Sequence, residues 1–165
     1  MSRKPVIYFA GPLFTIQDRR YLEEISELVE AAGAKTFLPH RDNQDNARNR
    51  TPDTSRKKLR SIFKKDIQGV EKADAIITFL DGVPVDAGTA IELGYAYSRS
   101  KSILGIKSDF RVLGNFDNQL IDLMVENVCS KIIFIPDGDW TKLTKGINQF
   151  VRSLIKDFAK NNKKR

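Results

Sequence analysis

The sequence is poor in the residues on which several common kinds of site chemistry depend. Its 165 residues include one cysteine, Cys129, and one histidine, His40. A single cysteine excludes an internal disulfide, and a lone histidine has no metal-ligand partner at suitable spacing. Cys129 stands in an apolar setting before a predicted strand, where nothing nearby would favour its thiolate. We therefore expect no metal site and no cysteine nucleophile.

Motifs for nucleotide cofactors and for serine hydrolases are also missing. Residues 11–15, Gly-Pro-Leu-Phe-Thr, follow the first predicted strand but form neither a Walker A loop nor a GxGxxG loop. No Gly-x-Ser-x-Gly elbow occurs in the chain. We expect no cofactor, so any chemistry falls to carboxylates and tyrosines.

Long apolar runs are absent as well. The first apolar segment, residues 6–10, is too short for the core of a signal peptide, and no run approaches membrane-spanning length. We expect a cytoplasmic protein with no membrane partner.

Positive charge is what the chain has in excess, with 28 Lys and Arg against 21 Asp and Glu and a net charge of +7. Much of it lies in residues 56–65 and in the C-terminal tail. A basic balance can indicate a nucleic-acid partner. No aromatic residues interleave with these runs as a stacking platform requires, so we interpret them as a solvated helix face and a solvated tail.

Short β-rich runs alternate with helical patterns along the chain. This alternation predicts an α/β fold, a single-domain, doubly wound, five-stranded parallel sheet of the flavodoxin/Rossmann-like kind. The domain is expected to span residues 1–160, with a basic tail at 161–165. In such sheets ligands bind beyond the carboxyl ends of the strands. The expected strands are 6–10, 36–38, 75–80, 102–106 and 131–135; the expected helices are 18–32, 56–71, 87–99, 117–128 and 140–160, with a polar loop at 40–55.

Two carboxylates flank the start of the helix that follows the central strand, Asp86 and Glu92. Gly88, one turn before Glu92, allows a ligand to approach the backbone closely, and a helix N-terminus stabilises negative charge. A structural interpretation fits the same residues. The spacing from Thr89 to Glu92 is that of a capping box, and Asp86 is a good N-cap.

Asp66 adds a third carboxylate. It shares the apolar stripe of its predicted helix, defined by Leu59, Ile62, Phe63 and Val70, so we expect it to point toward the sheet. A buried carboxylate is costly unless it is paired or functional; the alternative is a hydrogen-bonded structural aspartate. Carboxylates gathered at one cleft suit glycosidic chemistry, in which one attacks the anomeric carbon and another manages the leaving group's proton.

Seven segments of the chain resemble, in order, the nucleoside 2-deoxyribosyltransferase family, which also includes deoxynucleotide N-hydrolases. The most specific is Asp-Ala-Gly-Thr-Ala-Ile-Glu-Leu-Gly-Tyr-Ala at 86–96. The resemblance implies transfer of 2-deoxyribose between nucleobases, with deoxynucleosides and free nucleobases as partners. It also implies a homo-oligomer, a dimer or higher, whose sites are completed by a neighbouring subunit. The matching segments are 7–14, 62–66, 73–76, 81–82, 86–96, 108–111 and 121–124.

Roles for individual residues follow from the same resemblance. Glu92 resembles the family nucleophile, and Tyr8 resembles the tyrosine that orients it; the other interpretation of Tyr8 is core packing. Asp66 and Asp86 resemble the acids that hold the base and help to protonate it. Substrate-binding positions are expected at Gly88, Gly11, Pro12 and Phe14, in the loop after Pro39, and at Asp122 or, one turn earlier, Asn118.

Asp122 departs from the family pattern, which commonly has asparagine in transferases and serine in nucleotide hydrolases at this position. A carboxylate can accept a hydrogen bond from a 5'-hydroxyl but repels a 5'-phosphate. Free nucleosides are therefore favoured, although the basic surface favours phosphate. Hydrolysis of deoxynucleosides or their monophosphates by the same residues is the alternative function. A non-enzymatic nucleotide- or nucleic-acid-binding module is the more remote one.

Overall fold

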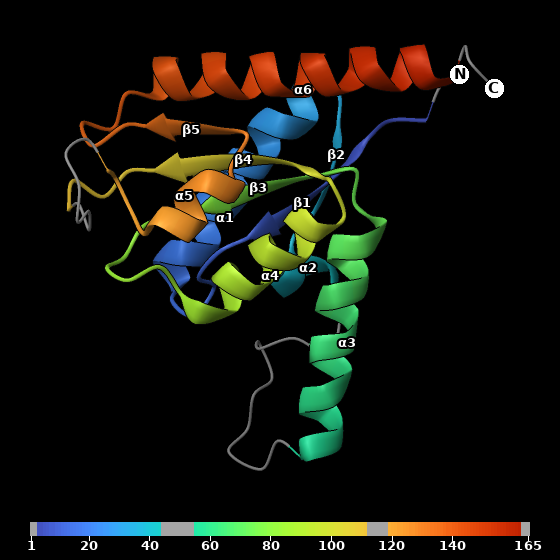
Figure 1. Cartoon of the computed structure of the whole chain (residues 1–165), viewed down its shortest axis with the longest axis vertical. Helices are drawn as coiled ribbons and strands as arrows, with labels where there is room; N and C mark the ends of the chain where they lie inside the picture. The colour runs from blue at the N-terminus through green and yellow to red at the C-terminus, as the bar shows by residue number, and fades with distance from the viewer. Residues whose placement is uncertain (1–2, 44–54, 112–118, 163–165) are drawn as a thin grey trace.

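A five-stranded parallel sheet forms the centre of the molecule, as the computed structural model in Figure 1 shows. The structure describes residues 3–43, 55–111 and 119–162. The strand order is β2-β1-β3-β4-β5, and all four pairings are parallel. The predicted α/β, flavodoxin-like fold is therefore confirmed. The strands are β1 (Val6–Ala10), β2 (Lys35–Phe37), β3 (Ala75–Phe79), β4 (Ser102–Lys107) and β5 (Lys131–Phe134).

Helices cover both faces of this sheet and create two separate hydrophobic layers. On one face, α1 (Ile16–Ala31) and α6 (Trp140–Asn162) pack against the strands. On the other face lie α3 (Arg56–Lys72), α4 (Ala87–Ser98) and α5 (Leu123–Val128). One short helix, α2 (Pro39–Asp42), begins the segment predicted as a loop. Sequences that bury strands on both faces read as continuous apolar runs, and β3 is buried at every position.

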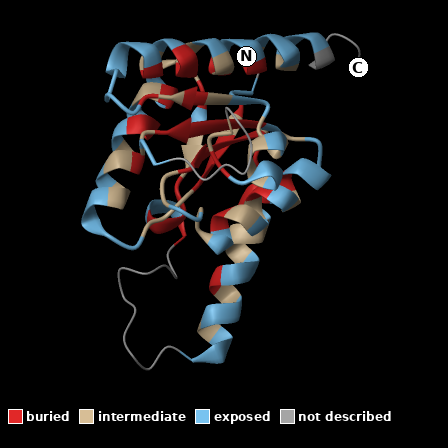
Figure 2. Ribbon diagram, turned by 60° about the vertical axis from the view of Figure 1, so that its left-hand side comes forward, coloured by how far each residue is buried: buried red, intermediate tan, exposed pale blue. Residues whose placement is uncertain are grey.

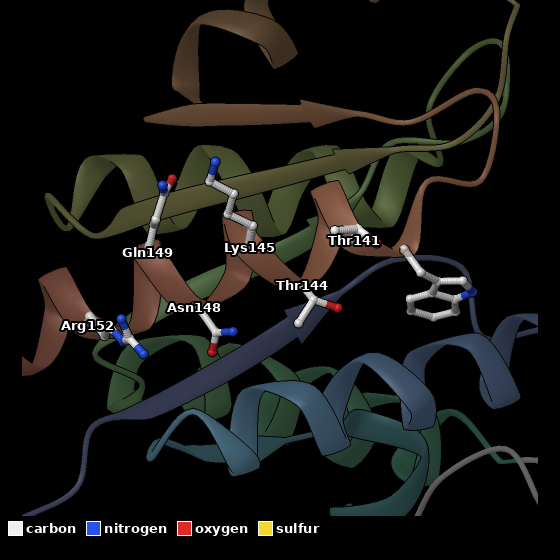
Figure 3. Close-up of a pocket in the computed structure, with 7 residues that line it drawn as sticks. Thr141, Thr144, Lys145, Asn148, Gln149 and Arg152 are labelled. Carbon is white, nitrogen blue, oxygen red and sulfur yellow. The ribbon is translucent and has the colours of Figure 1, made fainter.

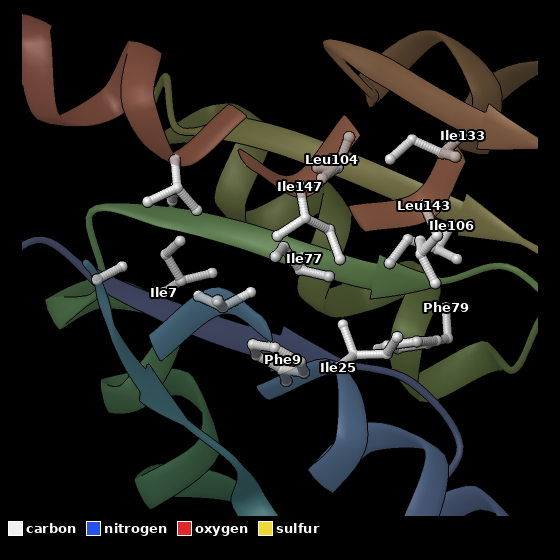
Figure 4. Close-up of a cluster of buried hydrophobic side chains, with 14 of the residues drawn as sticks. Ile7, Phe9, Ile25, Ile77, Phe79, Leu104, Ile106, Ile133, Leu143 and Ile147 are labelled. Carbon is white, nitrogen blue, oxygen red and sulfur yellow. The ribbon is translucent and has the colours of Figure 1, made fainter. Parts of the chain in front are cut away.

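The layer under α1 and α6 is the larger of the two cores. Figure 4 shows side chains of β1, β3 and β4 meeting those of α1 and α6, with Ile77 facing Ile147 of α6 and Phe9 near Ile25 of α1. Figure 2 shows the buried residues gathered in the strands and on the inner helix faces. The second layer, around Tyr8 and Leu93, contains the candidate site.

Two helices differ from their prediction. The helix expected at 117–128 begins only at Leu123, because the Asp122 carboxylate accepts hydrogen bonds from the backbone N–H groups of Met124 and Val125 and so ends the preceding loop; residues 112–118 lie outside the described part. In α3, Leu59 and Phe63 belong to the predicted apolar stripe, but both side chains are exposed. The N-terminal half of α3 extends beyond the sheet (Figure 1), so only its later residues, such as Val70, reach the core.

None of the helices within the described ranges is long and apolar enough to cross a bilayer.

Candidate active site

The candidate site lies where the strand order reverses, between β1 and β3. Chain connections leave these two neighbouring strands toward opposite faces of the sheet, which opens a crevice beyond their carboxyl ends. Tyr8 of β1 lies beside Ile76 of β3 in the register of the sheet. Helix α4 begins shortly after β3 and carries Glu92 over the same face.

Tyr8 and Glu92 are joined by a direct hydrogen bond. The Tyr8 hydroxyl donates to Glu92 Oε1 over 2.6 Å. The Tyr8 ring is fully buried and stacks on Phe37 of β2, with ring centroids 5.6 Å apart. Burial, and then the charge of Glu92, hold the pKa of Tyr8 well above its ordinary value. Tyr8 therefore remains a protonated donor at any physiological pH.

Opposing influences set the ionisation of Glu92. Burial raises its pKa to about 8, and the nearby charges of Asp66 and Asp86 act in the same direction. The hydrogen bond from Tyr8 works against them, because it favours the carboxylate. The interpretation of Glu92 as a capping-box residue is wrong, since α4 already has its N-cap at Asp86 and the Glu92 carboxylate is bonded to Tyr8.

Asp86 has a structural role at the start of α4. Its Oδ2 accepts hydrogen bonds from the Thr89 backbone N–H at 2.9 Å and from the Thr89 hydroxyl at 3.1 Å. The N-cap interpretation of Asp86 is thus confirmed. Because its charge also raises the pKa of Glu92, the same carboxylate contributes to the electrostatics of the site.

Asp66 reaches the site from α3. It is half-buried, and its Oδ1 accepts a hydrogen bond of 3.0 Å from Asn43 Nδ2. Its charge raises the pKa of both Tyr8 and Glu92, so it lies close to the pair. Asn43, which is buried just after α2, was missed in the sequence because nothing in its polar loop marks a contact with α3.

A comparison with known families finds a match over most of the chain. The sequence model described as Nucleoside 2-deoxyribosyltransferase matches residues 7–132, which include Tyr8, Asp66, Asp86 and Glu92. The chain belongs to this family.

Individual relatives of this nucleoside 2-deoxyribosyltransferase family member have low sequence identity to it. The uncharacterized protein C191.05c of Schizosaccharomyces pombe is 30% identical over 115 residues, which are 66% of this chain and 52% of that protein. The chain thus spans about half the length of this curated relative. The solved structure of a 2-deoxyribosyltransferase from Bacillus psychrosaccharolyticus has a TM-score of 0.65 and 22% identity, covering 84% of this chain and 90% of that one. A CMP N-glycosidase of Clostridium botulinum gives 0.57 and 17%, with coverage of 87% and 98%. These two likenesses show the fold.

The loop after β3 and the loop after β4 are joined by hydrogen bonds. Asp81, after β3, accepts hydrogen bonds from the backbone N–H groups of Ser108 and Asp109, after β4, at 2.7 and 2.8 Å. Asp109 in turn accepts from the Gly82 N–H at 3.2 Å. This clamp fixes the start of the loop that leads to Asp86. The sequence places these residues in matching segments without indicating that they contact one another.

The remaining predicted substrate-binding residues of this family member lie around the edge of the fold. Gly11 and Pro12 are half-buried after β1, whereas Phe14 and Gly88 are exposed. Asp122 is exposed at the N-terminus of α5. Asn118 lies outside the described residues, as does the predicted loop from residue 44 to residue 54. The four residues that the structure brings together are Tyr8, Asp66, Asp86 and Glu92.

The single histidine and the single cysteine make contacts of their own, and one hollow lies along α6. His40 Nε2 lies 3.0 Å from Glu23 Oε1, and burial raises the pKa of the Cys129 thiol to about 12. Within the described residues, no three His, Cys, Asp or Glu side chains are grouped to hold a metal ion. A hollow of about 640 Å³ runs along α6 from Trp140 to Arg152 (Figure 3). It belongs to the helix that covers the opposite face of the sheet from Glu92.

Proposed function

We propose that this protein breaks and remakes the N-glycosidic bond of 2'-deoxynucleosides, with Glu92 as the nucleophile. The observation that carries the proposal is the bond between Tyr8 and Glu92 beside two further carboxylates, at the switch point of a family member. The hydroxyl holds one carboxylate oxygen, which leaves the other to attack. In retaining glycosidases, too, one carboxylate attacks the anomeric carbon while a second carboxyl group handles the proton of the leaving group.

The first step forms an ester between Glu92 and C1' of the sugar. As the carboxylate attacks, the C1'–N bond breaks and its electron pair goes to the base, which takes up a proton. Asp66 is better suited than Asp86 to carry that proton, because Asp86 Oδ2 is occupied by two hydrogen bonds from Thr89. Asn43 fixes the orientation of Asp66.

The second step releases the sugar to an acceptor. A nitrogen of an incoming base attacks C1', the ester bond breaks, its electrons return to the Glu92 carboxylate, and the proton of the incoming base passes to Asp66. Two inversions give net retention at C1'. With water as the acceptor, the same residues perform hydrolysis, and the name of the structurally similar CMP N-glycosidase supports that alternative.

The nucleophile is tested by trapping it. Wild-type protein mixed with deoxyinosine and free adenine is expected to produce deoxyadenosine, and intact-mass spectrometry under rapid acid quench should show one deoxyribosyl adduct. Glu92→Gln should lose both signals, with activity reduced at least about 10³-fold. Glu27→Gln, an exposed glutamate of α1 on the other face of the sheet, should lose neither.

The outcomes separate the alternatives. Activity without an adduct would overturn covalent catalysis by Glu92. Formation of deoxyribose without deoxyadenosine would assign the hydrolase. A protein that binds DNA in a salt-sensitive manner and is indifferent to Glu92→Gln would be a non-enzymatic binding module.

We further infer that the site is shared between subunits of a homo-oligomer. The helices on the face that carries Glu92 expose large apolar side chains, including Phe63 of α3, Ile91 of α4 and Met124 of α5. Such side chains gathered on one side of a molecule are typical of protein interfaces. If Asp122 serves a neighbour's site, mixing inactive Glu92→Gln with an inactive Asp122→Ala protein should restore activity. Sedimentation at assay concentration should show a dimer or larger species.

A further inference from the structure

Glycine in the middle of a helix is unfavourable, so Gly69 of α3 needs a physical reason. It is buried, and it faces the aromatic stack of the candidate site. A Cβ at this position would lie 2.8 Å from Tyr8 Cε2, 3.0 Å from Tyr8 Cδ2 and 3.0 Å from Phe37 Cε1. Contacts this short do not occur, so a side chain at residue 69 would force a displacement.

The Tyr8 ring, which is the nearer neighbour of Gly69, has little freedom to move aside, whereas Phe37 is half-buried and lines a hollow together with Gly69. Tyr8 and Phe37 are rigid rings, stacked with 14° between their planes, and the Tyr8 ring has no exposed surface. Cε2 is bonded to the carbon that carries the Tyr8 hydroxyl, so pressure on it acts directly on the hydrogen bond to Glu92. Asp66 stands one helical turn before Gly69, on the same face of α3. The distance between α3 and β1 therefore also sets how closely Asp66 approaches Glu92.

We propose that Gly69 is a positioning residue, whose missing side chain lets α3 close onto the Tyr8 ring and so holds the Tyr8 hydroxyl on Glu92. The proposal rests on the proposed function in taking Glu92 as the reacting carboxylate. The added methyl of Gly69→Ala tilts the ring and lengthens the bond to Glu92. Because that bond lowers the pKa of Glu92 more strongly than the charge of Asp66 raises it, its weakening leaves the pKa of Glu92 higher.

The test reads the Glu92 carboxyl directly. The full-length protein is labelled with ¹³C at glutamate Cδ, and the Glu92 signal is assigned by its absence in Glu92→Gln. Titration is expected to show a higher pKa in Gly69→Ala, by roughly one unit, the scale of a hydrogen bond to a charged group. At neutral pH, kcat/KM should fall about tenfold for the same reason. An unchanged or lowered pKa of Glu92 would overturn the proposal.

Substitutions of two other helical glycines distinguish an effect on the position of Tyr8 from a general loss of stability. Gly94 lies within α4, where a Cβ would meet nothing within 4 Å, so Gly94→Ala should leave the pKa of Glu92 unchanged. At Gly146 of α6 a Cβ would lie 2.4 Å from Ile133 Cδ1, on the opposite face of the sheet. Gly146→Ala should lower Tm and still leave the pKa of Glu92 unchanged.

A double-mutant cycle identifies the group through which Gly69 acts. Tyr8→Phe should raise the pKa of Glu92, and adding Gly69→Ala to it should raise that pKa no further. A full additional increase would contradict action through the hydroxyl. If Gly69→Ala does not fold, Phe37→Leu loosens the same stack from its other side, and no change in the pKa of Glu92 in that variant would overturn the proposal.

The titration needs no turnover, so the two proposals can fail separately. A raised pKa in Gly69→Ala, in a protein with neither exchange nor hydrolysis, would retain Gly69 as the positioning residue and reject the enzyme. An active wild type with an unmoved pKa in Gly69→Ala would do the reverse.

Discussion

The hydroxyl of Tyr8 donates a hydrogen bond of 2.6 Å to Glu92 and thereby joins β1 to α4 across the switch point of the sheet. This bond stabilises the charged form of a carboxylate that burial and two neighbouring aspartates make harder to ionise. A nucleophile must be ionised to attack. With a pKa of about 8, Glu92 is largely protonated at neutral pH in the free protein.

The first prediction is that activity rises with pH and levels off above about 8. The acidic limb of kcat/KM reports the free enzyme's essential base, here Glu92. Because the charge of Asp66 raises the pKa of Glu92, Asp66→Asn should move the limb to lower pH even as it reduces the maximal rate. Steady-state rates at a series of pH values measure both.

Tyr8→Phe is the opposite control for this profile, since loss of its hydrogen bond should move the limb to higher pH. A limb at the same pH in wild type and in both variants would show that Glu92 is not the titrating base.

The pattern of apolar runs in the sequence was sufficient to predict the five strands of the sheet. Each predicted strand lies within one or two residues of an observed strand, because runs such as 75–79 are buried on both faces and must be apolar throughout. Helix boundaries failed where a side chain decided them. The Asp122 side chain caps α5, and hydrophobic periodicity does not predict such a capping hydrogen bond. Leu59 and Phe63 satisfy helical spacing, yet α3 extends past the sheet that would have buried them.

Site residues were predictable where their type and their position in a predicted helix or strand were enough to indicate a role. Glu92, Asp86 and Asp66 stand at informative positions relative to strands and helices. The contact of Asn43 with Asp66 joins residues 23 apart, and the approach of Gly69 to Tyr8 joins residues 61 apart. Such contacts depend on the packing distance between α3 and β1, which hydrophobic periodicity does not encode.

The second prediction concerns stability rather than rate. Between the ordinary glutamate pKa of 4.5 and about 8, the folded protein holds a proton on Glu92 that the unfolded chain has lost. The free energy of unfolding of the wild type therefore falls as the pH rises through this window. Glu92→Gln removes this decrease, because glutamine does not ionise. It should be more stable than wild type by about 2 kcal/mol above the window, since a half-buried group is partly solvated, and nearly equal below it.

Urea unfolding at both ends of the window measures this difference. If the stability gap between wild type and Glu92→Gln is the same at each end, Glu92 does not carry a raised pKa in the folded state.

The third prediction concerns Lys107, the last residue of β4. Its side chain is fully buried, and its Nζ has no hydrogen-bond partner among residues 3–43, 55–111 and 119–162. Burying an unpaired polar group is unfavourable, so Lys107→Met, which keeps the stem, should stabilise the fold by about 1–3 kcal/mol. Lys101 is the matched contrast. Its Nζ donates to the carbonyls of Glu71 and Ala73, so Lys101→Met should destabilise. Destabilisation by both would show that Lys107 is satisfied in the folded protein.

The fourth prediction tests substrate choice at Asp122. Its carboxylate caps α5 by accepting from the Met124 N–H at 2.9 Å, and asparagine is an equally good N-cap, so Asp122→Asn should preserve the helix. Loss of the negative charge removes repulsion toward a 5'-phosphate. The ratio of kcat/KM for deoxynucleoside 5'-monophosphates to that for deoxynucleosides should rise at least about tenfold, the effect of roughly 1.4 kcal/mol. Asp157→Asn removes an exposed charge of α6, on the other face of the sheet, and should leave the ratio unchanged. If both variants leave it unchanged, Asp122 does not face the 5'-position.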